Sequence, residues 1–327
     1  QSMPKQFLDI LGTGKSFIRH TYERFAKIVP AGNFLVVTNH KYKDLVLQHI
    51  PEIGEKQVLC EPIGRNTAPC IAYAAYTLLR ENPDAEMIVT PSDHLILNED
   101  DFRTIIGECL EFADRHDALL TVGIKPTRPD TGYGYIQVSD DHTISKVKCF
   151  TEKPDLELAQ TFLQTGEFYW NSGIFIWKVQ AIVEAFRKYL PEHHAMFSGV
   201  MKALGTDAEK TTVEIVFSEC RAISIDYGIM EKADNVYVRC GDFGWSDVGM
   251  VLGLPARPQR PLRQRRPRRG VLCLRHAQQH RLAAQGQGSG HQRPEGIHRR
   301  GHRRRIDDMP PRRRTEHQEI HRRSKVP

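Results

Sequence analysis

Residues 87–94 read M-I-V-T-P-S-D-H, an apolar, β-branched run that ends in a polar turn. Such a run predicts a buried strand, and the turn would place Asp93 at the carboxyl end of that strand. A carboxylate at this edge of a sheet is a suitable ligand for Mg²⁺. The alternative is an ordinary turn aspartate that caps the next helix.

Similar apolar runs alternate with longer amphipathic stretches on both sides of this segment. The expected strands are residues 34–38, 57–60, 87–90, 119–122, 134–138, 145–150, 174–177 and 235–239. The expected helices are residues 41–49, 69–81, 102–116, 156–165, 179–189 and 207–216. This alternation predicts an α/β fold with a mixed, mostly parallel sheet and helices on both faces. Ligands of such sheets bind beyond the carboxyl ends of the strands.

The composition changes abruptly near Gly249. Residues 250–327 hold 20 Arg and 1 Lys against 5 acidic residues, a net charge of +16, so residues 1–249 carry −10 of the overall +6. This tail has none of the chain's aromatic residues and is rich in proline. Because such a composition buries too little apolar surface to offset chain entropy, we expect a disordered tail without a folded domain.

Two hypotheses account for the tail. Its composition is the one that a GC-rich gene gives when it is read out of frame, and we hypothesise a frameshift close to Gly249. The other hypothesis is an RNA-binding tail, since a charge of +16 would attract phosphates. Without aromatic residues for base stacking, such binding would be unspecific, so we expect no specific nucleic-acid partner.

The cysteines and the hydropathy indicate the compartment. The seven cysteines show no C-x-x-C spacing, which argues against a zinc site or a disulfide framework and fits a reducing compartment. No apolar run approaches the roughly 20 residues that span a bilayer, and the sequence has no signal-peptide layout. We expect a cytoplasmic protein with no membrane partner.

Residues 61–69 read E-P-I-G-R-N-T-A-P and lead from a strand into a helix. Asn66 or Thr67 is a natural N-cap, and the free backbone N–H groups together with Arg65 could bind an anion. The alternative is an ordinary capped helix with a solvated arginine.

Two further turns flank strands of the mixed segment. Residues 131–136, T-G-Y-G-Y-I, place glycines at the mouth of a strand, where a missing Cβ lets a ligand approach the backbone. A simple hairpin is the alternative. Residues 150–154, F-T-E-K-P, put an acid beside a base, which suits sugar hydroxyls and a phosphate. An exposed ion pair is the alternative.

The last two motifs place polar groups next to apolar strands. Residues 170–175, W-N-S-G-I-F, put an amide before a strand, and residues 243–249, F-G-W-S-D-V-G, supply a second candidate metal carboxylate. Each motif could be only a turn, but six such turns in this order are more specific.

The series from residue 4 to residue 249 resembles the mannose-1-phosphate guanylyltransferase family, the GDP-mannose pyrophosphorylases. The R-N-T-A-P and P-S-D-H forms favour it over the thymidylyl and uridylyl relatives. The resemblance implies a Rossmann-like nucleotidyltransferase fold of the GT-A type over residues 1–249. It also implies transfer of a nucleotidyl group from GTP to mannose 1-phosphate, giving GDP-mannose and pyrophosphate, with Mg²⁺ as the cofactor.

The same resemblance assigns roles by position. Asp93 and Asp247 would hold the Mg²⁺, Lys5 would neutralise charge near the α-phosphate, and Lys153 would meet the sugar phosphate. The implied substrate-binding residues are Glu61, Arg65, Asn66 and Thr67, which border the nucleotide, and Gly134, Glu152 and Asn171, which fix the sugar. The implied reaction relies on positioning and charge stabilisation and needs no covalent nucleophile.

One departure from the family concerns the start. Family members begin with a strand and a G-G-x-G-x-R loop before the Pro-Lys pair, whereas here Lys5 lies close to Gln1. We therefore expect unpaired edges in the sheet and little or no transferase activity from this polypeptide.

Other functions remain open at this stage. Glucose 1-phosphate with another nucleotide is the alternative substrate pair, and a non-catalytic sugar-nucleotide-binding relative is the alternative class. An oligomer and a downstream isomerase domain in the parent gene are possible.

Overall fold

The computed structural model describes residues 3–138, 140, 142–247 and 270–275. By its internal contacts the chain divides into residues 1–279 and 280–327, and the second unit lies outside the described residues. Among the described residues nine strands form one sheet in the order β2-β1-β11-β3-β8-β5-β9-β7-β6. They are β1 (Phe34–Asn39), β2 (Val58–Glu61), β3 (Glu86–Pro91), β5 (Leu119–Ile124), β6 (Tyr135–Val138), β7 (Ser145–Thr151), β8 (Phe168–Lys178), β9 (Val236–Gly241) and β11 (Gly270–Arg275). A separate two-stranded sheet pairs β4 (His94–Ile96) with β10 (Trp245–Asp247).

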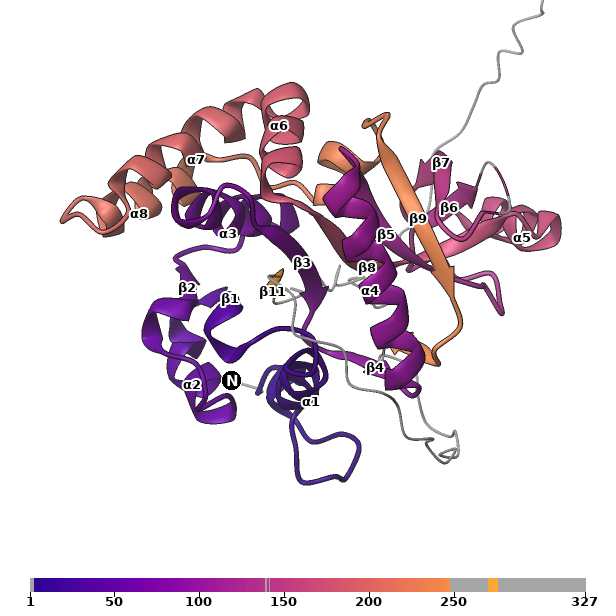
Figure 1. Ribbon diagram of the computed structural model, residues 1–327, viewed down its shortest axis with the longest axis horizontal. Helices are drawn as coiled ribbons and strands as arrows, with labels where there is room; N and C mark the ends of the chain where they lie inside the picture. Colours follow the sequence, from indigo (N-terminus) through magenta and orange to yellow (C-terminus); the bar gives the residue numbers. More distant parts are fainter. Residues whose placement is uncertain (1–2, 139, 141, 248–269, 276–327) are drawn as a thin grey trace, which may run out of the picture. The chain divides into compact units, whose positions relative to one another are not determined.

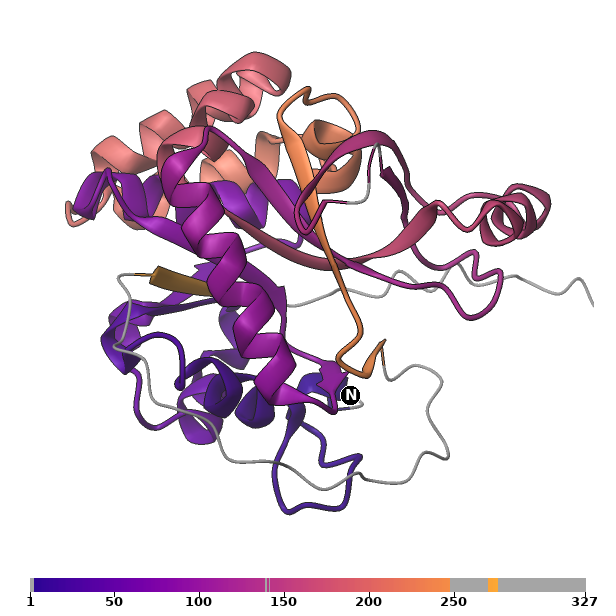
Figure 2. The same cartoon turned by 45° about the vertical axis from the view of Figure 1, so that its right-hand side comes forward.

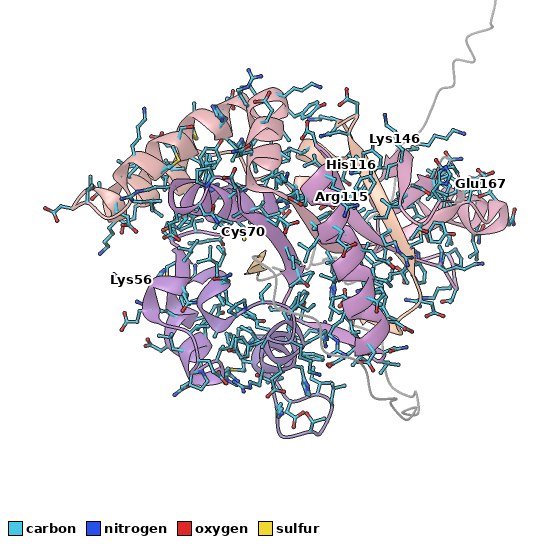
Figure 3. All side chains as sticks on the ribbon, in the orientation of Figure 1. Lys56, Cys70, Arg115, His116, Lys146 and Glu167 are labelled. Carbon is cyan, nitrogen blue, oxygen red and sulfur yellow. The ribbon has the colours of Figure 1, made fainter. Side chains whose placement is uncertain are left out.

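The sheet is mixed, as predicted. Strands β2, β1, β11 and β3 pair in parallel, and β8 runs antiparallel to both β3 and β5. Strand β9 is parallel to β5, while β6 and β7 form an antiparallel end of the sheet. Figure 3 shows Lys56, before β2, and Glu167, before β8, on opposite sides of the view.

Helices cover both faces, as predicted. The main ones are α1 (Phe17–Phe25), α2 (Lys43–His49), α3 (Thr67–Glu81), α4 (Glu99–Arg115), α5 (Leu156–Thr165), α6 (Val179–Tyr189), α7 (Pro191–Ala203) and α8 (Glu209–Glu219). Single turns are η1 (Lys5–Phe7), η2 (Ala31–Asn33), η3 (His40–Tyr42), η4 (Glu55–Gln57) and η5 (Asp226–Met230). The sequence patterns missed α1 and α7. In the part of the chain that the structure describes, none of the helices combines the length and the apolar composition of a membrane span.

Two hydrophobic cores lie on the two faces of the sheet. Met87 and Val89 of β3 belong to one core and Ile88 to the other, because side chains of a strand alternate between faces. Helices α3, α6, α7 and α8 contribute to the first core, and α1, α2, α4 and α5 to the second. Figure 2 shows α4 crossing one face, with α6 to α8 beyond the other.

Strand β11 changes two expectations. It lies between β1 and β3 (Figure 1), where Leu272 pairs with Phe34 on one side and with Ile88 on the other. The expected unpaired edges are therefore wrong for β1 and β3. The tail predicted to lack a folded domain supplies these six residues, and the rest of it lies outside the described residues. The average composition of the tail hid the short run V-L-C-L at residues 271–274.

Strand β8 begins earlier than predicted. It runs from Phe168, so Asn171 lies inside the strand rather than before it. The reason is tertiary, since Phe168, Tyr169 and Trp170 pair with β6, which alternation along one chain segment cannot reveal.

We predict that replacing Leu272 by proline destabilises the protein, since proline cannot donate the ladder hydrogen bond of a central strand. The expected loss of unfolding free energy is about 3 kcal/mol. Leu272→Val, which keeps the N–H group, is the control. Urea unfolding of the two variants measures the difference. Equal stability of the proline and valine variants would show that residues 270–275 are not a strand of the folded sheet.

Candidate active site

The first part of the site is a lysine between two carboxylates. Asp93 follows β3, and Asp247 is the last residue of β10. Asp247 pairs with His94 of β4, the residue after Asp93. The Lys5 Nζ atom, on η1, lies 2.9 Å from Asp247 Oδ1 and 3.4 Å from Asp93 Oδ2. The structure thus brings together three residues that are far apart in the sequence, Asp93 and Asp247 from two separate motifs and Lys5 from the family resemblance.

The two carboxylates keep this lysine charged. Burial lowers the pKa of the Lys5 ammonium, but the charges and hydrogen bonds of Asp93 and Asp247 outweigh burial, so the pKa lies above its ordinary value. Asp93 is itself buried, and its Oδ1 atom has no hydrogen-bond partner among the described residues. A buried carboxylate oxygen without a partner is costly unless a ligand completes it.

These two carboxylates fit a magnesium ion. Mg²⁺ is commonly held by one or two carboxylates together with substrate phosphates and water. Asp93 Oδ1 could accept the ion while Oδ2 keeps its contact with Lys5.

The second part of the site is the loop between β2 and α3. Asn66, at a positive φ of 68°, is the N-cap of α3, and its Oδ1 atom accepts a hydrogen bond from Thr67 N at 2.8 Å. Thr67 Oγ1 accepts from Ile225 N at 2.8 Å. Arg65 donates to the carbonyls of Phe217 and Ser218 at 2.6 and 2.5 Å, at the end of α8. The Arg65 guanidinium thus caps the C-terminal end of α8, and its expected place beside the nucleotide stays a prediction.

Glu61 lies at the carboxyl end of β2 and starts this loop. Burial raises the pKa of its carboxyl to about 7, and a contact with Cys70 opposes this only in part. The Oε1 atom is buried and has no hydrogen-bond partner in the described part of the chain. A buried acceptor in this position is available to a ligand that donates hydrogen bonds.

The third part is the turn after β7 with its neighbours. Glu152 Oε1 lies 3.3 Å from Lys153 Nζ, and Lys153 has a φ of 48°. A Cβ on Gly134 would overlap the Glu152 carboxylate and lie 3.4 Å from Asn171 Cβ. Gly134 also accepts a hydrogen bond from Asn171 N through its carbonyl oxygen, at 2.8 Å. The glycine thus lets the side chains of this part approach each other.

Tyr133 lies in the 131–136 motif but is not among the predicted site residues, and it connects the first and third parts. Its ring centroid is 5.2 Å from that of Trp245, beside Asp247, and 5.1 Å from that of Trp170, beside Asn171. Burial, followed by the charges of Asp247 and Asp130, raises the pKa of Tyr133 to about 12. Its hydroxyl is therefore a hydrogen-bond donor at neutral pH.

The profile of one protein family, described as nucleotidyl transferase, matches residues 1–255. The xanthan biosynthesis protein XanB of Xanthomonas campestris is 38% identical over 252 residues, covering 76% of this chain and 53% of that protein. The mannose-1-phosphate guanylyltransferase ManC of Salmonella typhimurium is 36% identical over 257 residues, with coverages of 75% and 53%. This chain thus spans about half the length of these curated relatives.

A solved structure shows the same fold. The mannose-1-phosphate geranyltransferase of Thermus thermophilus superimposes with a TM-score of 0.68 at 32% identity, covering 75% of this chain and 70% of that one. The Rossmann-like nucleotidyltransferase fold expected from the motifs is therefore confirmed.

Replacing Gly134 by alanine should destabilise the protein, because the added methyl group meets the Glu152 carboxylate. Because the clash is with the flexible end of a side chain that is nevertheless mostly buried, we expect a loss of about 1 kcal/mol of unfolding free energy, the lower end of the range for overpacking. Gly199→Ala is the matched control, because Gly199 lies in α7 with open space around it. Alanine there should increase the unfolding free energy by at most about 1 kcal/mol. Chemical denaturation of both variants decides, and a neutral Gly134 variant would contradict the packing described for the third part.

Glu61 should make stability depend on pH. Its folded pKa of about 7 lies above the ordinary 4.5, so unfolding releases a proton between these values and the unfolding free energy falls as pH rises. Glu61→Gln removes the cost of burying an ionised carboxylate. The variant should therefore have a higher unfolding free energy than wild type near pH 8, by an amount on the order of 3 kcal/mol, but not near pH 4.

Unfolding in urea at both pH values measures this difference. Glu214→Gln, at an exposed position of α8, is the control and should follow the wild type. If the difference in unfolding free energy between Glu61→Gln and wild type does not change with pH, the pKa of Glu61 is not raised.

Proposed function

This chain belongs to the nucleotidyl transferase family, and from that membership we propose that it transfers a guanylyl group from GTP to mannose 1-phosphate, giving GDP-mannose and pyrophosphate. The observation that carries the proposal is the Lys5, Asp93 and Asp247 group, which Tyr133 connects through the rings of Trp245 and Trp170 to the Glu152, Lys153 and Asn171 group. A charged phosphate site next to polar side chains that suit a sugar matches this pair of substrates. The Salmonella relative is named a mannose-1-phosphate guanylyltransferase, which supports the choice of mannose and guanine.

The reaction asks the protein mainly for positioning. A phosphate oxygen of mannose 1-phosphate attacks the α-phosphorus of GTP, and the bond from that phosphorus to the bridging oxygen of the β-phosphate breaks, which releases pyrophosphate. No proton has to be taken from an ionised phosphate oxygen, so no general base is needed. Holding the two reactants in line can supply several kcal/mol of the barrier reduction.

The cations of the chain have distinct tasks in this proposal. Lys5, held charged by Asp93 and Asp247, neutralises charge that develops on the α-phosphate. Lys153 is more than half exposed and can turn toward the sugar phosphate. Asp93 and Asp247 would hold Mg²⁺, which when bound supplies further positive charge to the phosphates.

Glu61 supports the choice of guanine. The Watson–Crick edge of guanine carries two neighbouring donors, N1–H and the N2 amino group, and a carboxylate can accept from both. Adenine presents an acceptor at N1, which would meet the same carboxylate unfavourably. The partnerless Oε1 of Glu61 is an acceptor of the required kind, and Asn66 and Thr67 order the loop beside it.

We predict that GDP-mannose with Mg²⁺ binds this chain at least about tenfold more tightly than ADP-mannose or UDP-glucose, a difference of about 1.4 kcal/mol. Isothermal titration calorimetry measures all three, and Asp93→Asn should lose the part of the affinity that depends on Mg²⁺. Glu61→Gln should lower the preference for GDP-mannose over ADP-mannose. Equal affinities, or a preference for UDP-glucose, would refute the choice of substrates.

A pyrophosphate-release assay with GTP, mannose 1-phosphate and Mg²⁺ measures turnover beside binding. Glucose 1-phosphate in place of mannose 1-phosphate is the comparison for the sugar. That this polypeptide has little or no transferase activity, as expected from the sequence, stays a prediction, and this assay measures it directly. The cytoplasmic location likewise stays a prediction.

A further inference from the structure

We propose that residues 223–231, which include the single π-helical turn η5, are a positioning element for the sugar side of the site, with Asp226 and Glu231 as its two positioning residues. This inference rests on the proposed function. None of the six motifs includes this segment. A single π-helical turn is uncommon and often lies at a functional site.

Asp226 fixes the orientation of the Asn171 amide. Asp226 is buried, and its Oδ1 atom accepts a hydrogen bond from Asn171 Nδ2 at 2.9 Å. Asn171 Oδ1 accepts from Thr121 Oγ1 at 2.8 Å and from Gly173 N at 3.1 Å. Because these partners occupy the oxygen and one N–H of the amide, the second N–H is the one that can meet a sugar hydroxyl.

Glu231 and Tyr227 hold the backbone of Glu152. The Glu231 Oε1 atom accepts a hydrogen bond from Glu152 N at 3.0 Å. The Tyr227 hydroxyl donates to Glu152 O at 3.4 Å. Lys153, the next residue, has a positive φ, which a lysine adopts only when its surroundings enforce it. The two contacts therefore help to set the direction of the Glu152 carboxylate and of Lys153.

The segment is itself anchored on the loop before α3. Ile223 N donates to Arg65 O at 3.3 Å, Ala68 N donates to Ile223 O at 3.0 Å, and Ile225 N donates to Thr67 Oγ1 at 2.8 Å. The loop assigned to the nucleotide thus holds the element that orients the sugar-binding side chains. In the described part of the chain, Asp226 contacts the sugar side through Asn171 and Glu231 contacts it through Glu152, so their removal should weaken sugar recognition more than nucleotide recognition.

The test compares GDP with GDP-mannose by isothermal titration calorimetry on the full chain. Asp226→Ala should weaken GDP-mannose binding by about tenfold, the loss expected when a buried hydrogen bond to a ligand-binding amide is removed, and GDP binding by less than about twofold. Asp226→Asn keeps an acceptor oxygen for Asn171 and should restore most of the affinity. In turnover assays, Asp226→Ala should raise the KM for mannose 1-phosphate more than it raises the KM for GTP.

Glu231 provides a second, exposed position at which loss of folding is not a concern. Glu231→Ala should weaken GDP-mannose binding about threefold to tenfold, whereas Glu231→Gln, which keeps an acceptor, should stay within about twofold of wild type. Glu214→Ala, another exposed glutamate, is the control and should bind as wild type does.

The outcomes separate this proposal from the proposed function. If the wild-type chain binds GDP-mannose and both alanine variants bind it equally well, the positioning role is wrong. An equal loss of GDP and GDP-mannose binding in these variants would indicate a general structural role and would also overturn the proposal. A wild-type chain that binds no GDP-mannose overturns the proposed function, and this inference with it.

Discussion

Strand β3 carries backbone hydrogen bonds on both of its edges, to β11 on one side and to β8 on the other. It joins the parallel half of the sheet to the mixed half, and its side chains alternate between the two hydrophobic cores. Both edges must be paired because buried backbone groups without partners are costly. The strand also leads directly to Asp93, so the pairing that stabilises the sheet sets the position of the catalytic candidate at its carboxyl end.

The elements that sequence predicts well are those whose pattern is local. The runs at residues 87–90 and 119–122 are completely buried strands, and apolar β-branched composition reveals such strands. The full extent of β8 and the inclusion of β11 depend on distant partners, β6 for the first and β1 with β3 for the second. Average composition is a poor guide where six residues with a different pattern are embedded in an arginine-rich segment.

For the site, residue types and strand ends identified the candidates but not their partners. The placement of Asp93 follows from the rule that ligands bind beyond the carboxyl ends of strands. Lys5 on η1 and Asp247 on β10 of the separate sheet were expected beside it from the family resemblance, and the structure adds that the lysine lies between the two carboxylates. Arg65 shows the limit of this reasoning, because its partners are α8 carbonyls about 150 residues away in the sequence. Asp226 and Glu231 lie outside every motif, since their contacts with Asn171 and Glu152 arise only in the folded chain.

The central claim is that one continuous site holds the phosphates at Lys5, Asp93 and Asp247 and the sugar at Glu152 and Asn171. A crystal structure of the chain with GDP-mannose and Mg²⁺ tests it most directly. The account predicts the diphosphate beside Lys5 and the two aspartates, mannose hydroxyls on the Glu152 carboxylate and the Asn171 amide, and the guanine edge on Glu61. Density for the ligand away from the carboxyl end of β3, or with the sugar and the diphosphate exchanged, would contradict it.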